Sequence, residues 1–326
     1  MPSISDAALR LAGILAGSSN ELSAPPGGEV SFFSSIEVRP LGRLARPADC
    51  WAVDGGQAVV ADARCIQVAV TRAARARWQN GGTVVEEAGE LHAHVLVGPG
   101  GGLEARRSLA ELGAPVAPES PVDLNLLRDW SEWQLVSRSV DEALPGALVL
   151  VDGDLQPDWR IPARWLDDLL VRASRRSVAL AGVTKHSSLA RGGAPLVGQL
   201  ELEAEAALGP RACWWAPVGV RRSDVGPGIL VTVARLDPDA RFAFRVDLPR
   251  DADAAELLGR LCALSDDAGF PGYPYPLSVA DRAAACPGWL REEAWAELDN
   301  ALAAAGVAAE VRERAFTDRH SLMERS

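Results

Sequence analysis

Two apolar runs in this chain each end at an aspartate that is followed by glycine. Residues 50–57 read C-W-A-V-D-G-G-Q, and residues 147–155 read A-L-V-L-V-D-G-D-L. The second run is almost wholly aliphatic, which is typical of a strand buried on both faces of a sheet. We interpret the first as a short strand that ends at Asp54 and turns on the two glycines, since glycine permits sharp turns and close approach. If the two strands are neighbours, Asp54 and Asp152 lie side by side.

The remaining pattern predicts a mixed α/β chain. Apolar residues at helical spacing predict helices, and β-branched or alternating runs predict strands. A β-meander follows Asp54, and helices and strands then alternate, so we expect one α/β domain with helical extensions. The first helix is amphipathic and is expected to pack on the body or on a partner chain. The expected helices are 5–15, 103–112, 122–143, 162–174, 252–266, 290–304 and 307–316; the expected strands are 30–38, 58–61, 66–71, 83–86, 92–97, 177–184, 214–218, 228–235 and 242–247.

Composition narrows the classes of protein. The chain has 326 residues, 48% of them hydrophobic, and a net charge of −11. No apolar run is long enough to span a bilayer, and the first residues lack the basic segment of a secretory signal. Five widely spaced cysteines without a C-x-x-C pair predict reduced thiols in the cytoplasm. The acidic balance counts against a simple basic nucleic-acid binder, although an enzyme that meets phosphate through cations carries acids at its centre.

Four acids on separate elements form the candidate site. Asp54 and Asp152 belong to strands, Glu132 lies in the helix at 122–143, and Asp281 lies at the start of a helix near the C-terminus. Carboxylates brought to one point repel each other unless they share a proton or a cation. Hard oxygen ligands suit Mg²⁺ or Mn²⁺, and two such ions about 4 Å apart support phosphodiester hydrolysis. This arrangement resembles the acidic centre of the ribonuclease H-like fold.

Simpler interpretations remain open for several of these residues. Asp-Gly after a strand is also an ordinary turn signal. Glu142 is closer to the Asp152 strand than Glu132 is, but it lies where the helix is ending. His92 and His94 share one strand face as metal ligands do, yet partly exposed strand histidines are commoner. The G-P-G-G-G at 98–102 lacks the residues of a P-loop and is interpreted as a flexible turn.

An ordered set of motifs resembles the NurA family of nucleases, partners of the HerA helicase in DNA end resection. The motifs cover roughly residues 45–290: A-V-D-G-G at 52–56, Glu132, L-V-L-V-D-G-D-L at 148–155, A-G-V-T-K at 181–185, F-R-V-D at 244–247 and G-Y-P-Y-P-L-S-V-A-D at 272–281. The resemblance implies that Asp54, Glu132 and Asp152 bind metal. It also implies that Tyr273 lies near the scissile phosphate.

Further roles follow from the same resemblance. Lys185, the only lysine in the chain, would contact DNA or phosphate. Arg245 is assigned to substrate binding, although pairing with an acid or a phosphate is favoured over contact with a base. Asp281 replaces a histidine that is typical of the family; an aspartate still binds metal but cannot act as an imidazole base. Gly56 stands where the family has serine.

The resemblance implies a Mn²⁺- or Mg²⁺-dependent deoxyribonuclease with two ions and 5′–3′ polarity. It would act as a homodimer with a HerA-type hexameric ATPase in double-strand break repair in the cytoplasm, with no membrane partner. The chain is expected to be a single NurA-like domain, with a lead-in at 1–45, a ribonuclease H-like core at 46–290 and C-terminal helices and tail at 291–326. Two alternatives remain: an inactive adaptor of the helicase complex, and a nucleotide-handling enzyme of the actin or sugar-kinase type.

Overall fold

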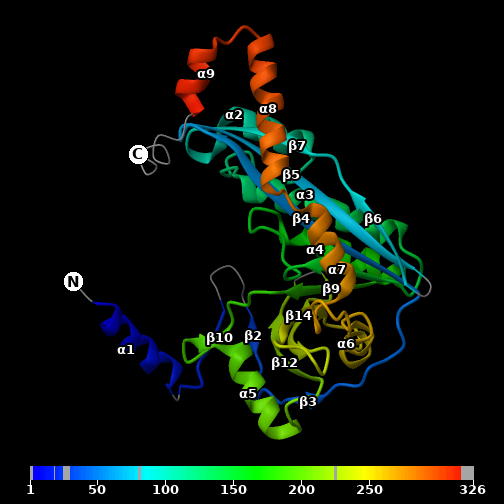
Figure 1. The fold of residues 1–326 in the computed structure, drawn as a ribbon. Helices are drawn as coiled ribbons and strands as arrows, with labels where there is room; N and C mark the ends of the chain where they lie inside the picture. Colours follow the sequence, from blue (N-terminus) through cyan, green and yellow to red (C-terminus); the bar gives the residue numbers. More distant parts are fainter. Residues whose placement is uncertain (1–2, 18, 25–29, 80–81, 224–225, 317–326) are drawn as a thin grey trace.

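The computed structural model describes residues 3–17, 19–24, 30–79, 82–223 and 226–316. The predicted tail after residue 316 lies outside these ranges. The chain builds a large sheet flanked by helices on both faces, with helical extensions at each end (Figure 1). The helices are α1 (Ile4–Leu15), α2 (Gly102–Glu111), α3 (Leu124–Glu142), α4 (Ala163–Arg175), α5 (Leu196–Leu208), α6 (Ala254–Cys262), α7 (Tyr275–Ala284), α8 (Gly288–Ala304) and α9 (Ala309–Phe316).

Parallel pairing occupies the centre of the main sheet. The strand order is β2-β12-β13-β14-β9-β8-β4-β5-β6, with β3 on β12 and β7 on β5. Strands β4, β8 and β9 are parallel, and the other pairs are antiparallel. The strands of this sheet are β2 (Ser31–Phe32), β3 (Arg39–Pro40), β4 (Asp49–Asp62), β5 (Ile66–Gln79), β6 (Thr83–Ala88), β7 (His92–Val97), β8 (Leu148–Asp152), β9 (Ala179–Thr184), β12 (Trp214–Arg221), β13 (Ile229–Arg235) and β14 (Phe244–Pro249). A small separate sheet joins β1 (Leu22–Ser23), β10 (Ala190–Arg191) and β11 (Ala194–Pro195).

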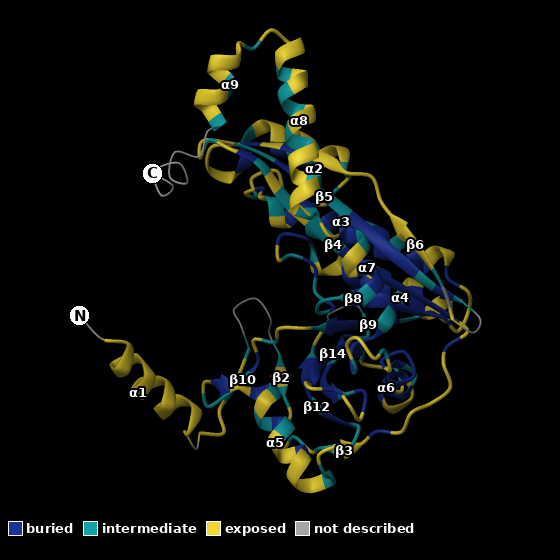
Figure 2. Cartoon of the chain, viewed as in Figure 1, coloured by how far each residue is buried: buried dark blue, intermediate teal, exposed yellow. Residues whose placement is uncertain are grey.

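Side-chain alternation along the central strands separates two hydrophobic cores. On β4, Trp51 and Val53 belong to the core that includes residues of α3, α4 and α5. Cys50 and Ala52 belong to the core that includes residues of α6 and α7. The central strands are accordingly buried on both faces, whereas α8 and α9 are largely exposed (Figure 2). The even-numbered positions of β4 therefore face α7, which fixes the direction of Asp54.

The α/β class predicted from the sequence, a mixed sheet flanked by helices with helical extensions at both ends, is confirmed, with corrections to individual elements. The strand through Asp54 does not end there: β4 continues for 14 residues through both glycines. No helix was predicted between residues 174 and 252, yet the segment 196–208 is helix α5. The strand expected at 30–38 is reduced to the two-residue β2. Glycine did not end β4 because both glycines adopt extended backbone within the β4–β5 ladder.

Helix α1 makes little contact with the rest of the described chain, where Ile14 near its C-terminal end approaches Gly193. None of its residues is buried, and Ile4 and Leu9 are 90% and 74% exposed. The expectation that this helix packs on the body is therefore wrong, while packing on a partner chain stays a prediction. Among the described residues, no helix has the length and apolar character required to cross a bilayer.

Candidate active site

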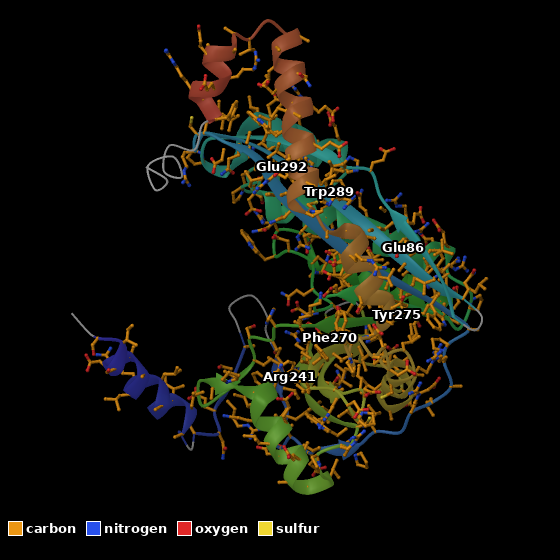
Figure 3. All side chains as sticks on the ribbon, in the orientation of Figure 1. Glu86, Arg241, Phe270, Tyr275, Trp289 and Glu292 are labelled. Atoms are coloured by element: carbon orange, nitrogen blue, oxygen red, sulfur yellow. The ribbon has the colours of Figure 1, made fainter. Side chains whose placement is uncertain are left out.

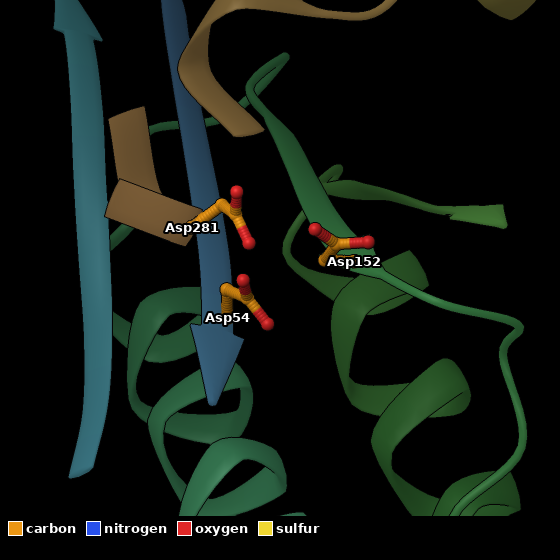
Figure 4. Close-up of side chains that lie close together, drawn as sticks. All are labelled: Asp54, Asp152 and Asp281. Carbon is orange, nitrogen blue, oxygen red and sulfur yellow. The ribbon is translucent and has the colours of Figure 1, made fainter. Parts of the chain in front are cut away.

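Three aspartates from three elements converge on one face of the sheet. One carboxylate oxygen from each of Asp54, Asp152 and Asp281 lies within 4.8 Å of the others. Figure 4 shows Asp54 on strand β4 and Asp281 on a helix, both opposite Asp152. They form the only group of three or more potential metal ligands within the described ranges. The sequence prediction that Asp54 and Asp152 lie together is met because β4 and β8 are parallel neighbours.

Helix α7 supplies the third acid through a close approach to β4. The carbonyl oxygen of Ala284 lies 1.9 Å from the position that a Cβ on Gly56 would occupy. Only glycine leaves room there, so Gly56 permits the C-terminal end of α7 to rest on the strand. Asp281 lies one turn earlier on α7, in the second half of the helix and not at its start as predicted. The two glycines after Asp54 thus serve close approach, and not a turn.

Lys185 is the cation of the site. Its Nζ lies 2.6 Å from Oδ2 of Asp152 and 3.3 Å from Oδ1 of Asp281. The same ammonium lies 5.1 Å from the centre of the Tyr273 ring, within the range of a cation–π contact. Strand β9 ends at Thr184, one residue before Lys185, and its parallel neighbour β8 ends at Asp152. The two strands therefore place the lysine and the aspartate at the same end of the sheet.

Burial and mutual repulsion disturb the charge states of these acids. Burial, followed by the charge of Asp152 and a hydrogen bond with Asp281, raises the pKa of Asp54 to about 8. Burial also raises the pKa of Asp152, although Lys185 opposes this effect. Partial burial disfavours the charge on Lys185, yet Asp152 and the other aspartates raise the pKa of its ammonium. Without a divalent cation, the site therefore retains a proton near neutral pH.

Tyr273 is buried beside Asp152. Its side chain is 2% exposed, and burial together with the charge of Asp152 raises the pKa of its hydroxyl above the ordinary range. The hydroxyl therefore stays protonated and remains a hydrogen-bond donor at the site.

Glu132 approaches from the opposite face of the sheet. It is 3% exposed, and its Oε2 lies 2.9 Å from the position that a Cβ on Gly55 would occupy. Oε2 also accepts a 2.8 Å hydrogen bond from Nη1 of Arg128, one helical turn away on α3. Burial raises the pKa of Glu132 well above its usual range, against the effect of Arg128. Glu132 thus lies behind Asp54 and outside the three-aspartate group, and its metal-binding role stays a prediction.

Glu142 does not approach the aspartates. Its Oε2 lies 2.8 Å from Nη2 of Arg75, a residue of β5, and its side chain is 48% exposed. Of the two glutamates that the sequence left open, Glu132 is therefore the one near Asp54. Arg128 was not singled out from the sequence, although its spacing of four residues from Glu132 is the signal of a helical ion pair.

Arg245 lies on the face of the sheet away from the aspartates. It is 4% exposed and donates two 2.8 Å hydrogen bonds to the carboxylate of Asp247. Its Nη1 also lies 3.2 Å from Asp154. Pairing with acids, which the sequence favoured over contact with a base, is thus what the structure contains, and substrate binding by Arg245 stays a prediction.

The acid partner Asp247 supports the segment that follows Asp152. It is fully buried, and its Oδ2 accepts a hydrogen bond from the amide of Leu155. Gly182 of β9 leaves room for the same segment, because a Cβ at this position would lie 2.5 Å from the carbonyl oxygen of Gly153. We therefore infer that the F-R-V-D motif supports the segment after Asp152 from the face of the sheet opposite the three aspartates. The alternation of Arg245 and Asp247 on one strand face is the signal that could have indicated this pairing.

The two strand histidines take no part in the acidic group. His94 is buried, lies 2.8 Å from the hydroxyl of Thr71, and has its pKa lowered to about 4 by burial. His92 is exposed. The interpretation as ordinary strand histidines fits both positions better than metal binding, although His94 is more buried than expected.

The donor set fits a hard divalent cation. All three converging side chains offer carboxylate oxygens, the ligands that Mg²⁺ and Mn²⁺ prefer. Oδ2 of Asp152 is buried, and the Lys185 ammonium, 2.6 Å away, is the positive charge beside it. Burial, and then the negative charge of Asp152, raise the pKa of Asp54, and a cation at this point would offset both effects.

Comparison with known proteins supports the family recognised from the motifs. Residues 218–286 match the model of the NurA domain. The crystal structure of the NurA nuclease from Sulfolobus solfataricus shares the fold, with a TM-score of 0.57, 16% identity and coverage of 93% of this chain and 95% of that one. The catalytic domain of human endonuclease V matches with a TM-score of 0.37 and 14% identity. The match covers 94% of this chain and 100% of that one. A comparison with curated proteins gave no match.

Proposed function

This chain carries a NurA domain, and from that premise we propose that it is a divalent-metal-dependent deoxyribonuclease. The observation that carries the proposal is the convergence of Asp54, Asp152 and Asp281 within 4.8 Å. Three acids held together from separate elements destabilise the fold unless a cation joins them, so their convergence favours a role in binding one.

Asp54, Asp152 and Asp281 would hold the cation, with Glu132 behind Asp54. When bound, Mn²⁺ or Mg²⁺ supplies an activated water and stabilises the leaving oxygen of a phosphodiester. Lys185 provides a mobile positive charge at the rim of the site, since its side chain is 37% exposed. Tyr273, kept protonated beside Asp152, donates a hydrogen bond to a phosphate oxygen. Asp281 is the solvent-facing acid of the three, with 57% of its side chain exposed.

The finer parts of the proposal come from the family resemblance. We propose 5′–3′ degradation of a DNA strand, two ions, a homodimer, and assembly with a HerA-type hexameric ATPase during double-strand break repair in the cytoplasm. The domain limits, with a core at 46–290, belong to the same proposal.

Mutation of Asp54 tests the proposal. Single-stranded oligonucleotides labelled at the 5′ or the 3′ end are incubated with Mn²⁺, and the label that shortens first gives the polarity. We expect Asp54→Asn to lower cleavage at least about a hundredfold, the scale of losing one group that stabilises transition-state charge. Asp62→Asn, the same change at the last residue of strand β4, is the matched control. Undiminished cleavage by Asp54→Asn would reject the nuclease assignment.

Calorimetry separates the nuclease from an inactive adaptor. The presence of Lys185 between Asp152 and Asp281 is the observation that favours the adaptor, since an ammonium already neutralises part of the site. A nuclease binds Mn²⁺ in a manner that depends on Asp54 and Asp152. A native protein that binds no Mn²⁺ supports the adaptor instead.

A further inference from the structure

Two exposed phenylalanines lie close to the candidate site. Phe270 is 49% exposed and Phe242 is 50% exposed. Apolar side chains of this size usually find cover, so their exposure together needs a reason. Arg241 stacks on the Phe242 ring, with its guanidinium carbon 5.2 Å from the ring centre. Figure 3 labels Arg241 and Phe270 on the half of the molecule that contains α5 and α6.

A chain of contacts joins Phe270 to the acids. The rings of Phe270 and Tyr273 have centres 6.1 Å apart and meet edge to face. Lys185 lies 5.1 Å from the Tyr273 ring and 2.6 Å from Asp152. Phe270 is therefore separated from the acidic group by Tyr273 and Lys185. Phe244, which contacts both Phe270 and Tyr273, belongs to the core on the α7 face, the face of Asp54.

The segment that carries Phe270 is held firmly. The amide of Phe270 bonds the carbonyl of Asp267, and the amide of Tyr273 bonds that of Phe270. Gly272 has a φ of +93°, and a Cβ there would lie 2.4 Å from the Cβ of Ala240. The loop that leads to Arg241 and Phe242 therefore packs directly on this segment. An exposed ring on a fixed backbone loses little freedom when it binds a flat partner.

We propose that Phe270 is a stacking platform for a base of the DNA strand under cleavage, with Phe242 and Arg241 beside it. The inference rests on the proposed nuclease function and specifies its substrate as an unpaired strand. Inside a duplex the neighbouring bases cover both faces of a base, whereas an unpaired, unstacked base exposes a face to a protein ring, and stacking tolerates every base. Arg241, on the neighbouring Phe242, has the positive charge needed to bind the phosphate next to the stacked base. Asp267, which bonds the amide of Phe270, has a negative charge and would not bind that phosphate. Loss of one such stack lowers affinity about tenfold to a hundredfold.

An abasic-site scan tests the platform. Single-stranded oligonucleotides carry one abasic site at successive positions from the cleaved bond, and KM and kcat are measured with Mn²⁺. For the native protein we expect KM to rise about tenfold or more when the abasic site meets Phe270, and little change elsewhere. Phe270→Ala should show the raised KM on every oligonucleotide, without position dependence. Phe270→Trp should restore the native profile.

A fluorescence signal reports stacking without cleavage. In an Asp152→Asn background, 2-aminopurine at the matching position should be quenched with Phe270 and bright with Phe270→Ala. Phe33→Ala is the matched control, because Phe33 is a 37% exposed phenylalanine beside β12, three strands away from β9.

The outcomes separate this inference from the nuclease proposal. Native KM, native position dependence and unchanged quenching in Phe270→Ala overturn the platform while leaving the nuclease intact, provided Asp54→Asn is inactive. A change in oligomeric state with unchanged DNA kinetics also overturns it, and assigns the patch to a protein contact. Full cleavage by Asp54→Asn instead rejects the nuclease itself.

Discussion

Gly56 controls the geometry of the acidic group, and its replacement by serine, the residue typical of the family, is the sharpest perturbation. A Cβ at this position would lie 1.9 Å from the carbonyl oxygen of Ala284 and 2.8 Å from its carbonyl carbon. Both atoms belong to the backbone at the end of α7, so no side-chain rotation relieves the clash. The helix must therefore move away from β4, together with Asp281 one turn earlier.

The size of the movement follows from the contact. The gap must open by 1.1 Å to reach 3.0 Å, below which real Cβ atoms essentially never approach, and by 1.5 Å to reach ordinary contact at 3.4 Å. A displacement of about 1 Å in a reacting constellation costs about a hundredfold in rate. Overpacking of this kind also costs about 1–3 kcal/mol in the free energy of unfolding. We therefore expect Gly56→Ser to lose about a hundredfold in cleavage and to bind Mn²⁺ more weakly.

The control separates geometry from stability. Gly219→Ser introduces a comparable backbone clash, since a Cβ there would lie 2.7 Å from the carbonyl oxygen of Ser31, but Gly219 lies on β12, three strands away from β9 and apart from the three aspartates. Both variants should lower the melting temperature, and only Gly56→Ser should weaken Mn²⁺ binding by calorimetry. If Gly56→Ser binds Mn²⁺ and cleaves single-stranded DNA like the native protein, the close contact between Gly56 and α7 does not control the position of Asp281, and the prediction is refuted.

Three further predictions follow from the charges. Lys185→Met leaves Asp152 without its cation, so the metal-free protein should melt at a lower temperature and gain more from Mn²⁺; an unchanged Mn²⁺-induced shift in a thermal scan contradicts this. Arg245→Met leaves Asp247 buried and unpaired, which should cost about 3–5 kcal/mol in urea unfolding with little effect on KM; native stability with a raised KM would instead support substrate binding. In EDTA, where no divalent cation is bound, Asp54 has a pKa of about 8 in the folded protein and near 3.8 in the unfolded chain. Between these values the folded protein holds a proton that the unfolded chain has released, so the free energy of unfolding should fall as pH rises from about 4 to 8. Asp54→Asn should flatten that fall, and an equally steep fall in the variant would refute the assignment.

Local pattern was sufficient for most elements and for the convergence of Asp54 and Asp152. Strand β8 is almost purely aliphatic, so its central position and its end at Asp152 follow from composition alone. The Asp-Gly-Gly segment misled because glycine signals both turns and close packing, and only tertiary contacts distinguish them. Gly56 is needed because the backbone of α7 lies against one face of β4, and Gly55 is needed because the Glu132 side chain lies against the other face.

Other features depend on long-range contacts that no local pattern contains. Helix α5 is an exception that local pattern could have predicted, because its sequence is rich in Leu, Glu and Ala and its three buried residues, Leu196, Leu200 and Ala204, recur every four positions. Whether Arg245 faces substrate or an acid depends on which side of β14 it occupies, and that side is set by β9 and β13. The identity of the Glu132 partner similarly depends on the register of α3 against β4.

The charge balance of the site gives Lys185 a role in both states of the protein. In the metal-free state its ammonium joins Asp152 and Asp281, and Asp54 retains a proton, so three carboxylates carry less than three negative charges near neutral pH. A divalent cation removes the need for both, because it satisfies the same oxygens more strongly. Binding should then release the proton of Asp54 and free the half-buried Lys185 for a phosphate. An aspartate at position 281 in place of the histidine typical of the family adds one negative charge, and so makes the site more dependent on that cation, not less.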